Sequence, residues 1–276
     1  MYTLNCKGRL LVIEKPVVMG ILNITPDSFY SGSRVQQLDD ILAKAEQMIC
    51  EGAAILDIGG QSTKPGSDRL AAGEELKRVL PAIQLIKEKH PGTFISIDTY
   101  HSTVAKEAIA AGADLVNDIS AGEMDGQIIS TVAALHVPYI AMHMKGTPET
   151  MQHKPAYNDV TKEVMDYFIQ KTNECKQAGI TDIIIDPGFG FGKTIQHNFQ
   201  LLKKLEAFQV FQVPILAGLS RKSTVYKTLN TTPEVALNGT TVLNTIALTK
   251  GASILRVHDA KEAVEAIKLY QAFLNA

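Results

Sequence analysis

The sequence predicts an α/β protein of the (β/α)8 TIM barrel class, and three features of the chain support this prediction. Short apolar runs alternate with longer stretches of helical periodicity along the 276 residues. Eight such units follow one another, which suits a closed barrel of about 250 residues. No glycine-rich dinucleotide fingerprint follows the first apolar run, and this counts against an open, doubly wound sheet.

The expected strands are short apolar runs separated by longer helical stretches. In chain order they cover residues 17–25, 54–60, 94–99, 115–120, 138–144, 182–188, 214–220 and 253–259. The stretches between them, for example 38–53, and the final stretch 260–276 carry apolar residues at the spacing of amphipathic helices. Glycine follows several of these helices, as at Gly52 and Gly251, because it adopts the left-handed cap conformation that ends a helix.

Residues 1–16 precede the first expected strand, and we expect them to form a short hairpin that caps the bottom of the barrel. Within "TLNCKGRLLVI" (3–13), two strand-like segments flank Lys7-Gly8, which suits a tight turn. No interdomain linker is visible, so the sequence predicts a single domain over residues 1–276.

The composition is typical of a globular protein with a sizeable core, since 45% of the residues are hydrophobic, 20% are charged and the net charge is −2. Lysine and arginine do not cluster, so no nucleic-acid partner is expected. No apolar run reaches the roughly 18 residues of a membrane span, and the amino terminus lacks a signal-peptide pattern. The three widely spaced cysteines indicate free thiols in the cytoplasm, and the apolar pattern around Cys50 predicts a core position for it.

Nearly every expected strand carries a polar residue at its carboxyl end. In chain order these are Asn23, Asp57, Asp98, Asn117, His143, Asp186, Ser220 with Lys222, and Arg256 with His258. A barrel brings these strand ends together on the face where active sites are built. Because an unpaired buried polar group costs about 1–3 kcal/mol, the convergence predicts a ligand that pairs with them.

Helix capping is the competing interpretation of these polar residues. Asp57 and Ser120 are as well suited to capping as to binding, because Asp and Ser are good caps. Capping does not account for Asn117 or for the two polar residues of the last strand, which lie inside apolar stretches. His143, taken alone, is more typical of a structural histidine than of a catalytic base.

Two polar loops follow the first two expected strands. Residues 25–34 and 59–75 are rich in Gly, Ser and Pro. Long loops on the active face of a barrel commonly act as lids, so we expect these segments to close over a ligand.

Seven motifs in the chain resemble those of the dihydropteroate synthases, a pterin-binding family of folate biosynthesis. They are "NITPDSF" (23–29), "DIGGQSTKPGS" (57–67), "SIDT" (96–99), "NDISAG" (117–122), "DPGFGFGKT" (186–194), "GLSRKS" (218–223) and "RVHD" (256–259). They occur in order and span residues 19–259. The barrel expected from the periodicity agrees with the fold that this resemblance implies.

The resemblance implies a transferase that joins 6-hydroxymethyl-7,8-dihydropterin diphosphate to 4-aminobenzoate and releases diphosphate. It implies Mg²⁺ as cofactor, sulfonamides as competitors of aminobenzoate, and a homodimer. The implied catalytic residues are Asp98, Lys222, Arg256 and His258, and the implied metal ligand is Asn23. The implied substrate-binding residues are Thr63, Asp98, Asn117, Met142, Asp186, Phe191, Gly218, Ser220, Lys222, Arg256 and His258.

Within this set, chemistry suggests a role for each group. A carboxylate such as Asp186 can accept two N–H bonds from the pterin edge, while Met142 and Phe191 can form apolar walls against flat rings. Arg256 and His258 can bind the diphosphate. The reaction expected is a dissociative substitution at the pterin methylene, with Asp98 favouring the cation and the aromatic amine attacking it.

The chain departs from the family pattern in both loops. Lys64 stands where the family usually has arginine, so a forked contact there is lost. Tyr30 and Ser31 replace the usual residues after the phenylalanine of the first loop.

Three alternatives remain from the sequence. A methyltetrahydrofolate–corrinoid methyltransferase would have no use for a diphosphate clamp such as Arg256 with His258. A Schiff-base aldolase would need an apolar pocket that lowers the pKa of Lys222. Lys222 lies in the polar sequence "SRKS", directly after Arg221, which does not suggest such a pocket. A non-catalytic pterin-binding homologue would not be expected to keep every proposed diphosphate and metal residue.

Overall fold

The computed structural model describes residues 1–24, 34–61, 69–148, 150–151 and 155–276, and its centre is an eight-stranded sheet. The strands are β3 (Val17–Asn23), β4 (Ile55–Gly59), β5 (Phe94–Asp98), β6 (Leu115–Asp118), β7 (Tyr139–Met142), β8 (Ile183–Asp186), β9 (Leu216–Ala217) and β10 (Ile254–Val257). They follow the order β8-β7-β6-β5-β4-β3-β10-β9, and neighbouring strands in this order pair in parallel. A parallel bridge between Ile185 and Ile215 brings the two ends of the sheet together, which confirms the predicted (β/α)8 barrel.

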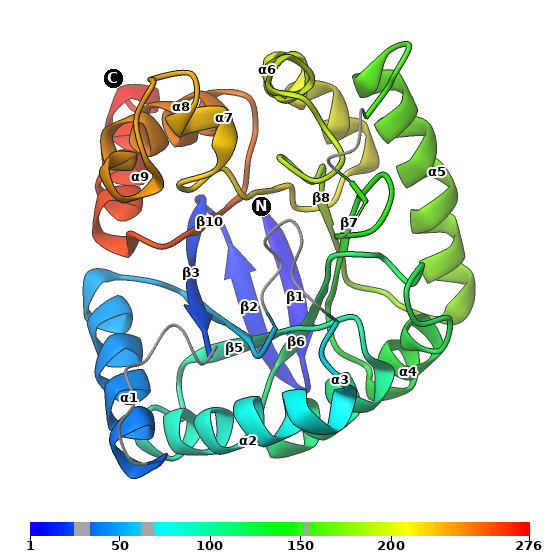
Figure 1. The fold of residues 1–276 in the computed structure, drawn as a ribbon, viewed down its shortest axis with the longest axis vertical. Coiled ribbons are helices and arrows are strands. Elements are labelled where there is room, and N and C mark those ends of the chain that lie inside the picture. Colours follow the sequence, from blue (N-terminus) through cyan, green and yellow to red (C-terminus); the bar gives the residue numbers. More distant parts are fainter. Residues whose placement is uncertain (25–33, 62–68, 149, 152–154) are drawn as a thin grey trace.

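Helices surround the strands on the outside (Figure 1). They are α1 (Arg34–Glu51), α2 (Ala72–Lys89), α3 (Ser102–Ala111), α4 (Ile128–Leu135), α5 (Val160–Ala178), α6 (Ile195–Lys203), α7 (Ser223–Tyr226), α8 (Leu237–Thr249) and α9 (Ala260–Leu274). Gly52 and Gly251 have φ angles of 101° and 92°, so both have the left-handed conformation predicted for the helix ends. Within the described ranges, no helix is both long and apolar enough to cross a membrane.

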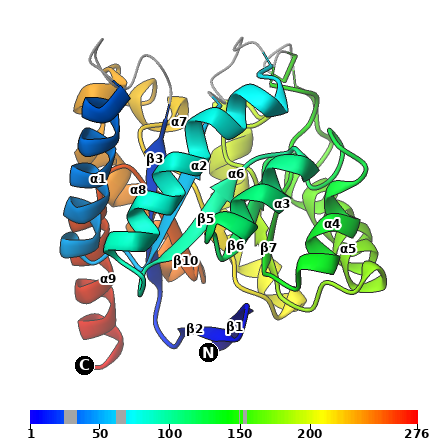
Figure 2. The same cartoon turned by 90° about the horizontal axis from the view of Figure 1, so that it is seen from below.

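The amino-terminal hairpin forms as predicted and packs beneath the barrel (Figure 2). It pairs β1 (Tyr2–Cys6) with β2 (Arg9–Ile13), and Lys7 and Gly8 both take positive φ in the turn. The hairpin side chains Leu4, Cys6, Leu11 and Ile13 form one buried cluster with the first inward residues of the strands, such as Met19 and Ile55. This apolar cluster closes the bottom of the barrel and leaves the top for polar residues.

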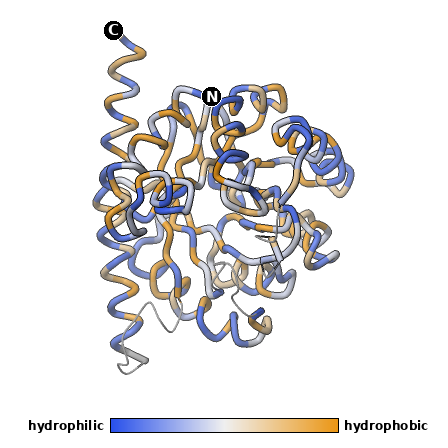
Figure 3. Tube along the Cα trace, turned by 45° about the horizontal axis from the view of Figure 1, so that its top comes forward, coloured by the Kyte–Doolittle hydropathy of each residue, from blue (hydrophilic) through white to orange (hydrophobic). Residues whose placement is uncertain are grey.

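The hydropathy pattern follows this layering (Figure 3). Hydrophobic segments run through the central strands, and α9 alternates hydrophobic and hydrophilic turns. On α1, the buried face consists of Ile41, Ala45 and Met48. Cys50 is exposed, so its predicted core position is wrong: two residues beyond Met48, it lies on the opposite side of the helix. Cys6, Cys50 and Cys175 are all free thiols, as predicted.

The hairpin gives a direct test of the packing below the barrel. Leu11→Ala removes a side chain that is 4% exposed, and we expect the free energy of unfolding to fall by about 2–5 kcal/mol. Urea denaturation followed by circular dichroism measures this change. Leu10→Ala is the matched control, because Leu10 is 61% exposed and its loss should cost less than about 0.5 kcal/mol. Equal losses in the two variants would contradict the packing of the hairpin on the barrel.

Candidate active site

The inward side chains of the strands change from apolar to polar as the strands rise. Met19, Ile55, Leu115, Ile140, Ile184, Leu216 and Ile254 form the lower layer. Because side chains alternate along a strand, the residues two positions later face the same interior. These are Ile21, Asp57, Asn117, Met142, Asp186, Gly218 and Arg256. The polar strand ends predicted from the sequence therefore converge in the upper half of the barrel.

Arg256 joins three strands at the centre of this polar layer. Its Nε donates to Asp57 Oδ2 at 2.6 Å, and its Nη2 donates to Asp98 Oδ2 at 2.5 Å. Asn117 Nδ2 donates to the same Asp57 oxygen at 3.0 Å. Burial alone would lower the pKa of Arg256, but the carboxylates of Asp57 and Asp98 raise it above its ordinary value. The guanidinium therefore stays positively charged and is held by the carboxylates of Asp57 and Asp98.

Asp98 lies at the carboxyl end of β5 and is 8% exposed. Burial raises the pKa of its carboxyl group, and the positive charge of Arg256 opposes that rise. The charge of Asp98 therefore depends on Arg256. Asp57 is fully buried and bonds Arg256 and Asn117, so it is part of the polar network and does not cap the following helix. The sequence placed Asp57 at a strand end but did not select it as a site residue.

Lys222 and Asp186 flank Gly218 in the barrel mouth. A Cβ atom on Gly218 would lie 3.5 Å from Lys222 Nζ and 3.8 Å from Asp186 Oδ2, so a glycine leaves the space between the two charges open. Asp186 Oδ1 accepts a bond from Gly188 N at 2.8 Å, and burial raises the pKa of its carboxyl group. The second oxygen of Asp186 faces the space beside Gly218.

The predicted absence of a pocket that depresses the pKa of Lys222 is wrong. Burial lowers the pKa of Lys222 to about 8, and Asp186 opposes that shift. The enclosure comes from the segment after β8, because Lys222 Nζ donates to Phe189 O at 2.6 Å and lies 4.7 Å from the centroid of the Phe191 ring. Arg221, its neighbour in sequence, instead forms a forked pair with Asp259 at 2.8 Å for both bonds.

Lys193 is a buried site residue that the sequence argument missed. Its Nζ lies 2.9 Å from His143 Nδ1 and donates to Gly188 O at 2.9 Å and to Phe191 O at 3.1 Å. Burial lowers the pKa of Lys193 to about 7 and that of His143 to about 2. The neutral His143 therefore has the structural role expected for it. The signal in the sequence was a lysine closing the glycine-rich "DPGFGFGKT" segment.

Gly188 allows this segment to approach β7 closely. Its φ angle is +71°, and a Cβ atom there would lie 1.9 Å from His143 O. The same segment places Phe191 in a buried apolar cluster with Tyr100, Ile119, Met142 and Met151. Met142 and Phe191 therefore lie in one apolar cluster, and their role as a wall for flat rings stays a prediction.

Ser220 and His258 pair at the rim of the mouth. Ser220 Oγ accepts a bond from His258 N at 3.2 Å and lies 3.0 Å from His258 Nδ1. A hydroxyl that already accepts is best satisfied by donating its proton to Nδ1, which places the ring proton on Nε2. His258 is exposed at the rim, but desolvation of its ring and the charge of Arg256 lower its pKa to about 4, so the ring is a neutral donor at pH 7.

Asn23 and Asp98 lie on either side of Gly59. A Cβ atom on Gly59 would lie 3.5 Å from Asn23 Oδ1 and 3.6 Å from Asp98 Oδ2. In the described part of the chain, no three His, Cys, Asp or Glu side chains could hold a metal ion by themselves. One amide oxygen near one carboxylate suits a cation such as Mg²⁺, which keeps waters and takes further oxygens from a substrate phosphate.

The base of the second loop is tied to the segment directly after β5. Gln61 Oε1 accepts bonds from Tyr100 Oη at 2.9 Å and from Leu70 N at 3.2 Å. Glu75, in the first turn of α2, is 1% exposed and accepts a bond from Thr99 Oγ1 at 3.2 Å. Burial raises the pKa of Glu75 to about 8, so Glu75 is mostly protonated at pH 7.

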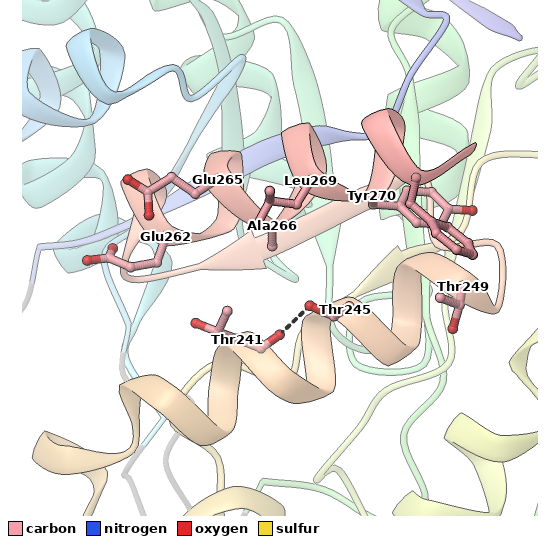
Figure 4. Close-up of a pocket in the computed structure, with 9 residues that line it drawn as sticks. Thr241, Thr245, Thr249, Glu262, Glu265, Ala266, Leu269 and Tyr270 are labelled. Atoms are coloured by element: carbon pink, nitrogen blue, oxygen red, sulfur yellow. Dashed lines mark hydrogen bonds between the residues drawn. The ribbon is translucent and has the colours of Figure 1, made fainter. Parts of the chain in front are cut away.

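Several predicted site features lie outside the described residues. They are Thr63, with Lys64 and Pro65 in the second loop, and Tyr30 and Ser31 in the first loop. One surface cavity, of about 340 Å³, lies away from the strand ends, between α8 and α9 (Figure 4). Thr241 and Thr245 line it from α8, and Leu269 and Tyr270 line it from α9.

The chain is similar to known proteins over nearly its whole length. The model of the pterin binding enzyme family matches residues 19–258. The dihydropteroate synthase of Escherichia coli (strain K12) is 43% identical over 275 residues, which cover 99% of this chain and 97% of that protein.

Similar solved structures include two that match over nearly the whole chain. The dihydropteroate synthase of Yersinia pestis with a sulfonamide drug has a TM-score of 0.94 and 40% identity, and the match covers 100% of both chains. The dihydropteroate synthase of Xanthomonas albilineans with 4-aminobenzoic acid has a TM-score of 0.93 and 38% identity, with coverage of 99% and 98%.

The raised pKa of Glu75 gives a test by pH. Between the ordinary value of 4.5 and about 8, the folded protein keeps a proton on Glu75 that the unfolded chain releases. The free energy of unfolding should therefore fall as the pH rises through this window, by at most about 1.4 kcal/mol per pH unit from this group. Glu75→Gln removes the titration and should flatten the slope, as measured by urea denaturation at several pH values.

Glu74→Gln is the matched control for this experiment, because Glu74 is its exposed neighbour in the same turn. We expect Glu74→Gln to keep the wild-type slope between those pH values. A Glu75→Gln variant with the wild-type slope would show that Glu75 titrates in the folded protein as it does in the unfolded chain.

Proposed function

The chain belongs to the pterin-binding enzyme family and is a transferase of the dihydropteroate synthase type, and we propose how its residues carry out the reaction. The substrates are 6-hydroxymethyl-7,8-dihydropterin diphosphate and 4-aminobenzoate, and the products are 7,8-dihydropteroate and diphosphate. The observation that carries the proposal is the polar layer in the barrel mouth, where Arg256 and Lys222 lie among the carboxylates of Asp57, Asp98 and Asp186.

The pterin would bind between the acidic and amide groups of this layer. Asp186 Oδ2 lies beside the open space at Gly218 and can accept the amine and ring N–H of the pterin edge. Asn117 already uses one amide N–H for Asp57, so its oxygen remains for a pterin donor. Lys222 can donate to the carbonyl or a ring nitrogen. Met142 and Phe191 supply the apolar wall for the flat ring.

The diphosphate would bind at the end of β10. Arg256 Nε and Nη2 donate to Asp57 and Asp98. Among the described residues Nη1 has no partner, so it can donate to an anion. His258 can add a neutral donor from Nε2, with its ring orientation held by Ser220. Both groups face charge that builds on the leaving oxygen, which is where preorganised donors lower a barrier most.

Asn23 would supply an oxygen ligand to Mg²⁺ at this end of the site, next to Asp98. The bound ion would neutralise part of the diphosphate charge. Because one amide oxygen cannot hold Mg²⁺ alone, its retention would depend on the substrate phosphates and water.

The reaction would begin with cleavage of the bond between the pterin methylene carbon and the diphosphate oxygen. Arg256 and His258 stabilise the departing charge, and the carboxylate of Asp98 favours the cation that spreads into the dihydropterin ring. The amine of 4-aminobenzoate then attacks the methylene carbon and loses one proton. The resemblance places this second substrate near Thr63, Pro65, Phe191, Ser220 and Lys222, where sulfonamides would compete with it.

The lowered pKa of Lys222 removes the sequence argument against Schiff-base chemistry, but the comparisons favour the synthase over an aldolase. A methyltransferase would not use the donors at Arg256 and His258. We propose that residues 1–276 form one domain, because the hairpin packs on the lower end of the barrel. We also propose a cytoplasmic location for the chain.

We also propose a homodimer that uses the face formed by α8 and α9. Val242 and Ile246 lie one turn apart on α8 and are 49% and 38% exposed. Leu269 and Phe273 have the same spacing on α9 and are 73% and 74% exposed. Leu269 and Phe273 also line the cavity between the two helices (Figure 4), and exposed apolar surface of this kind is typical of a protein interface.

The enzymatic proposal is tested by incubating the chain with both substrates and Mg²⁺. We expect dihydropteroate and diphosphate in equal amounts, and a loss of rate when a chelator removes Mg²⁺. Asp186→Asn should weaken pterin binding about 100-fold or more, because hydrogen bonds to a charged group contribute about 1.5–3 kcal/mol each. Asp166→Asn is the control, since Asp166 lies on the exposed side of α5. Binding of both substrates without product would contradict the proposal.

The dimer is tested by light scattering after gel filtration. The chain has a mass of 30.0 kDa, so a dimer should have twice that mass. Leu269→Lys with Phe273→Lys places two like charges in the proposed interface and should return the mass to that of one chain. Val210→Lys is the control, because Val210 is 69% exposed elsewhere on the surface. A wild-type protein with the mass of one chain at all concentrations would overturn the dimer.

A further inference from the structure

Asp57 contacts a residue of the proposed diphosphate site and a residue of the proposed pterin site. Its Oδ2 accepts from Arg256 Nε at 2.6 Å and from Asn117 Nδ2 at 3.0 Å. The two donors come from β10 and β6, on either side of β4 in the sheet order. One oxygen therefore sets the relative position of two groups that are far apart in the sequence.

Burial excludes a direct role for Asp57 in binding. The side chain is 0% exposed, and the residue lies two positions below the carboxyl end of β4. In the same interior, Asp98 lies at the end of β5 and is 8% exposed. Asp98 can therefore contact a ligand, whereas Asp57 acts only through the residues it holds.

Asp57 also determines which end of the Asn117 amide faces a ligand. An ionised carboxylate can only accept hydrogen bonds, so Asn117 must turn its Nδ2 toward Asp57. A flipped amide would place two acceptor oxygens against each other. In the present orientation Asn117 Oδ1 has no partner among the described residues, so this acceptor is left for a ligand.

For Arg256, the bond to Asp57 uses the Nε side of the guanidinium. This bond orients the planar group along one edge and leaves the two terminal nitrogens for Asp98 and for an anion. The charge of Asp57 also balances that of Arg256 inside the barrel, where an uncompensated ion would be costly.

We propose that Asp57 is a positioning residue that holds Arg256 and Asn117 in one arrangement, so that the diphosphate and the pterin bind in register with each other. This inference rests on the proposed function, because it assigns the two ligands to these two residues. It gives Asp57 a role beyond stabilising the barrel. A purely structural Asp57 would affect folding without affecting the affinity of the folded protein for either ligand.

The experiment measures binding of two separate probes by calorimetry: 6-hydroxymethylpterin, which lacks the diphosphate, and inorganic diphosphate with Mg²⁺. We expect Asp57→Ala to weaken both by about tenfold or more. Asp57→Asn keeps an acceptor but loses the charge, so its losses should be smaller and should again affect both probes. If the alanine variant does not fold, the asparagine variant carries the test.

Ser96→Ala is the matched control. Ser96 pairs with Asp57 across β4 and β5, is fully buried, and its hydroxyl has no partner among the described residues. The substitution changes a buried polar group at the same level of the barrel without touching Arg256 or Asn117. Both affinities should stay at the wild-type value.

Double-mutant cycles separate positioning from a general loss of structure. In an Arg256→Gln background, the Asp57 substitution should cause no further loss of diphosphate binding, and in an Asn117→Ala background no further loss of pterin binding. Additive losses, or variants that bind both probes as the wild type does, would overturn the inference. If the wild-type protein bound neither probe, the proposed function would fail instead.

Discussion

The site depends on one largely enclosed cation, the guanidinium of Arg256, which is held between the carboxylates of Asp57 and Asp98. A buried ion pair adds little net stability by itself, because removing both charges from water costs nearly as much as their attraction returns. Its value here is geometric. The pair links β10 to β4 and β5, and through Asp57 it also sets the amide of Asn117 on β6. The positions of several proposed substrate contacts thus follow from one set of charges.

This arrangement is possible because the barrel is closed from below by apolar side chains. The hairpin residues Leu4, Cys6, Leu11 and Ile13 pack against the first inward residues of the strands. That cluster excludes water from the lower barrel. Among the described inward side chains of the strands, the charged groups of Asp57, Asp98, Asp186 and Arg256 lie in the upper part, where Asp57 is completely buried and Asp98 is near the opening. The change from apolar to polar inward side chains along β4, β6, β8 and β10 separates the part that stabilises the fold from the proposed ligand-binding part.

The segment after β8 encloses the site from another side. Lys193 bonds Gly188 O, Phe191 O and His143, while Lys222 bonds Phe189 O and lies over the Phe191 ring. Burial lowers the pKa of both lysines. Nothing in the sequence indicates a lowered pKa for these two amines, and the fold alone gives them pKa values below the usual range. Gly188 makes this possible, since a side chain there would collide with the backbone of His143.

The sequence by itself determined the barrel, the hairpin with Lys7-Gly8 in its turn, and the convergence of polar strand ends, because alternating periodicity and strand-end position are local properties of the chain. Asn117, Asp186, Met142 and Phe191 were also placed from local patterns and motifs. Only the tertiary structure decided which groups touch, because Asp57 and Arg256 are 199 residues apart. Tertiary contacts likewise gave Asp57 two partners, enclosed Lys222 and Lys193, and put Cys50 on the exposed side of α1. Burial and pKa depend on neighbours from distant strands, and a pattern along one chain does not contain them.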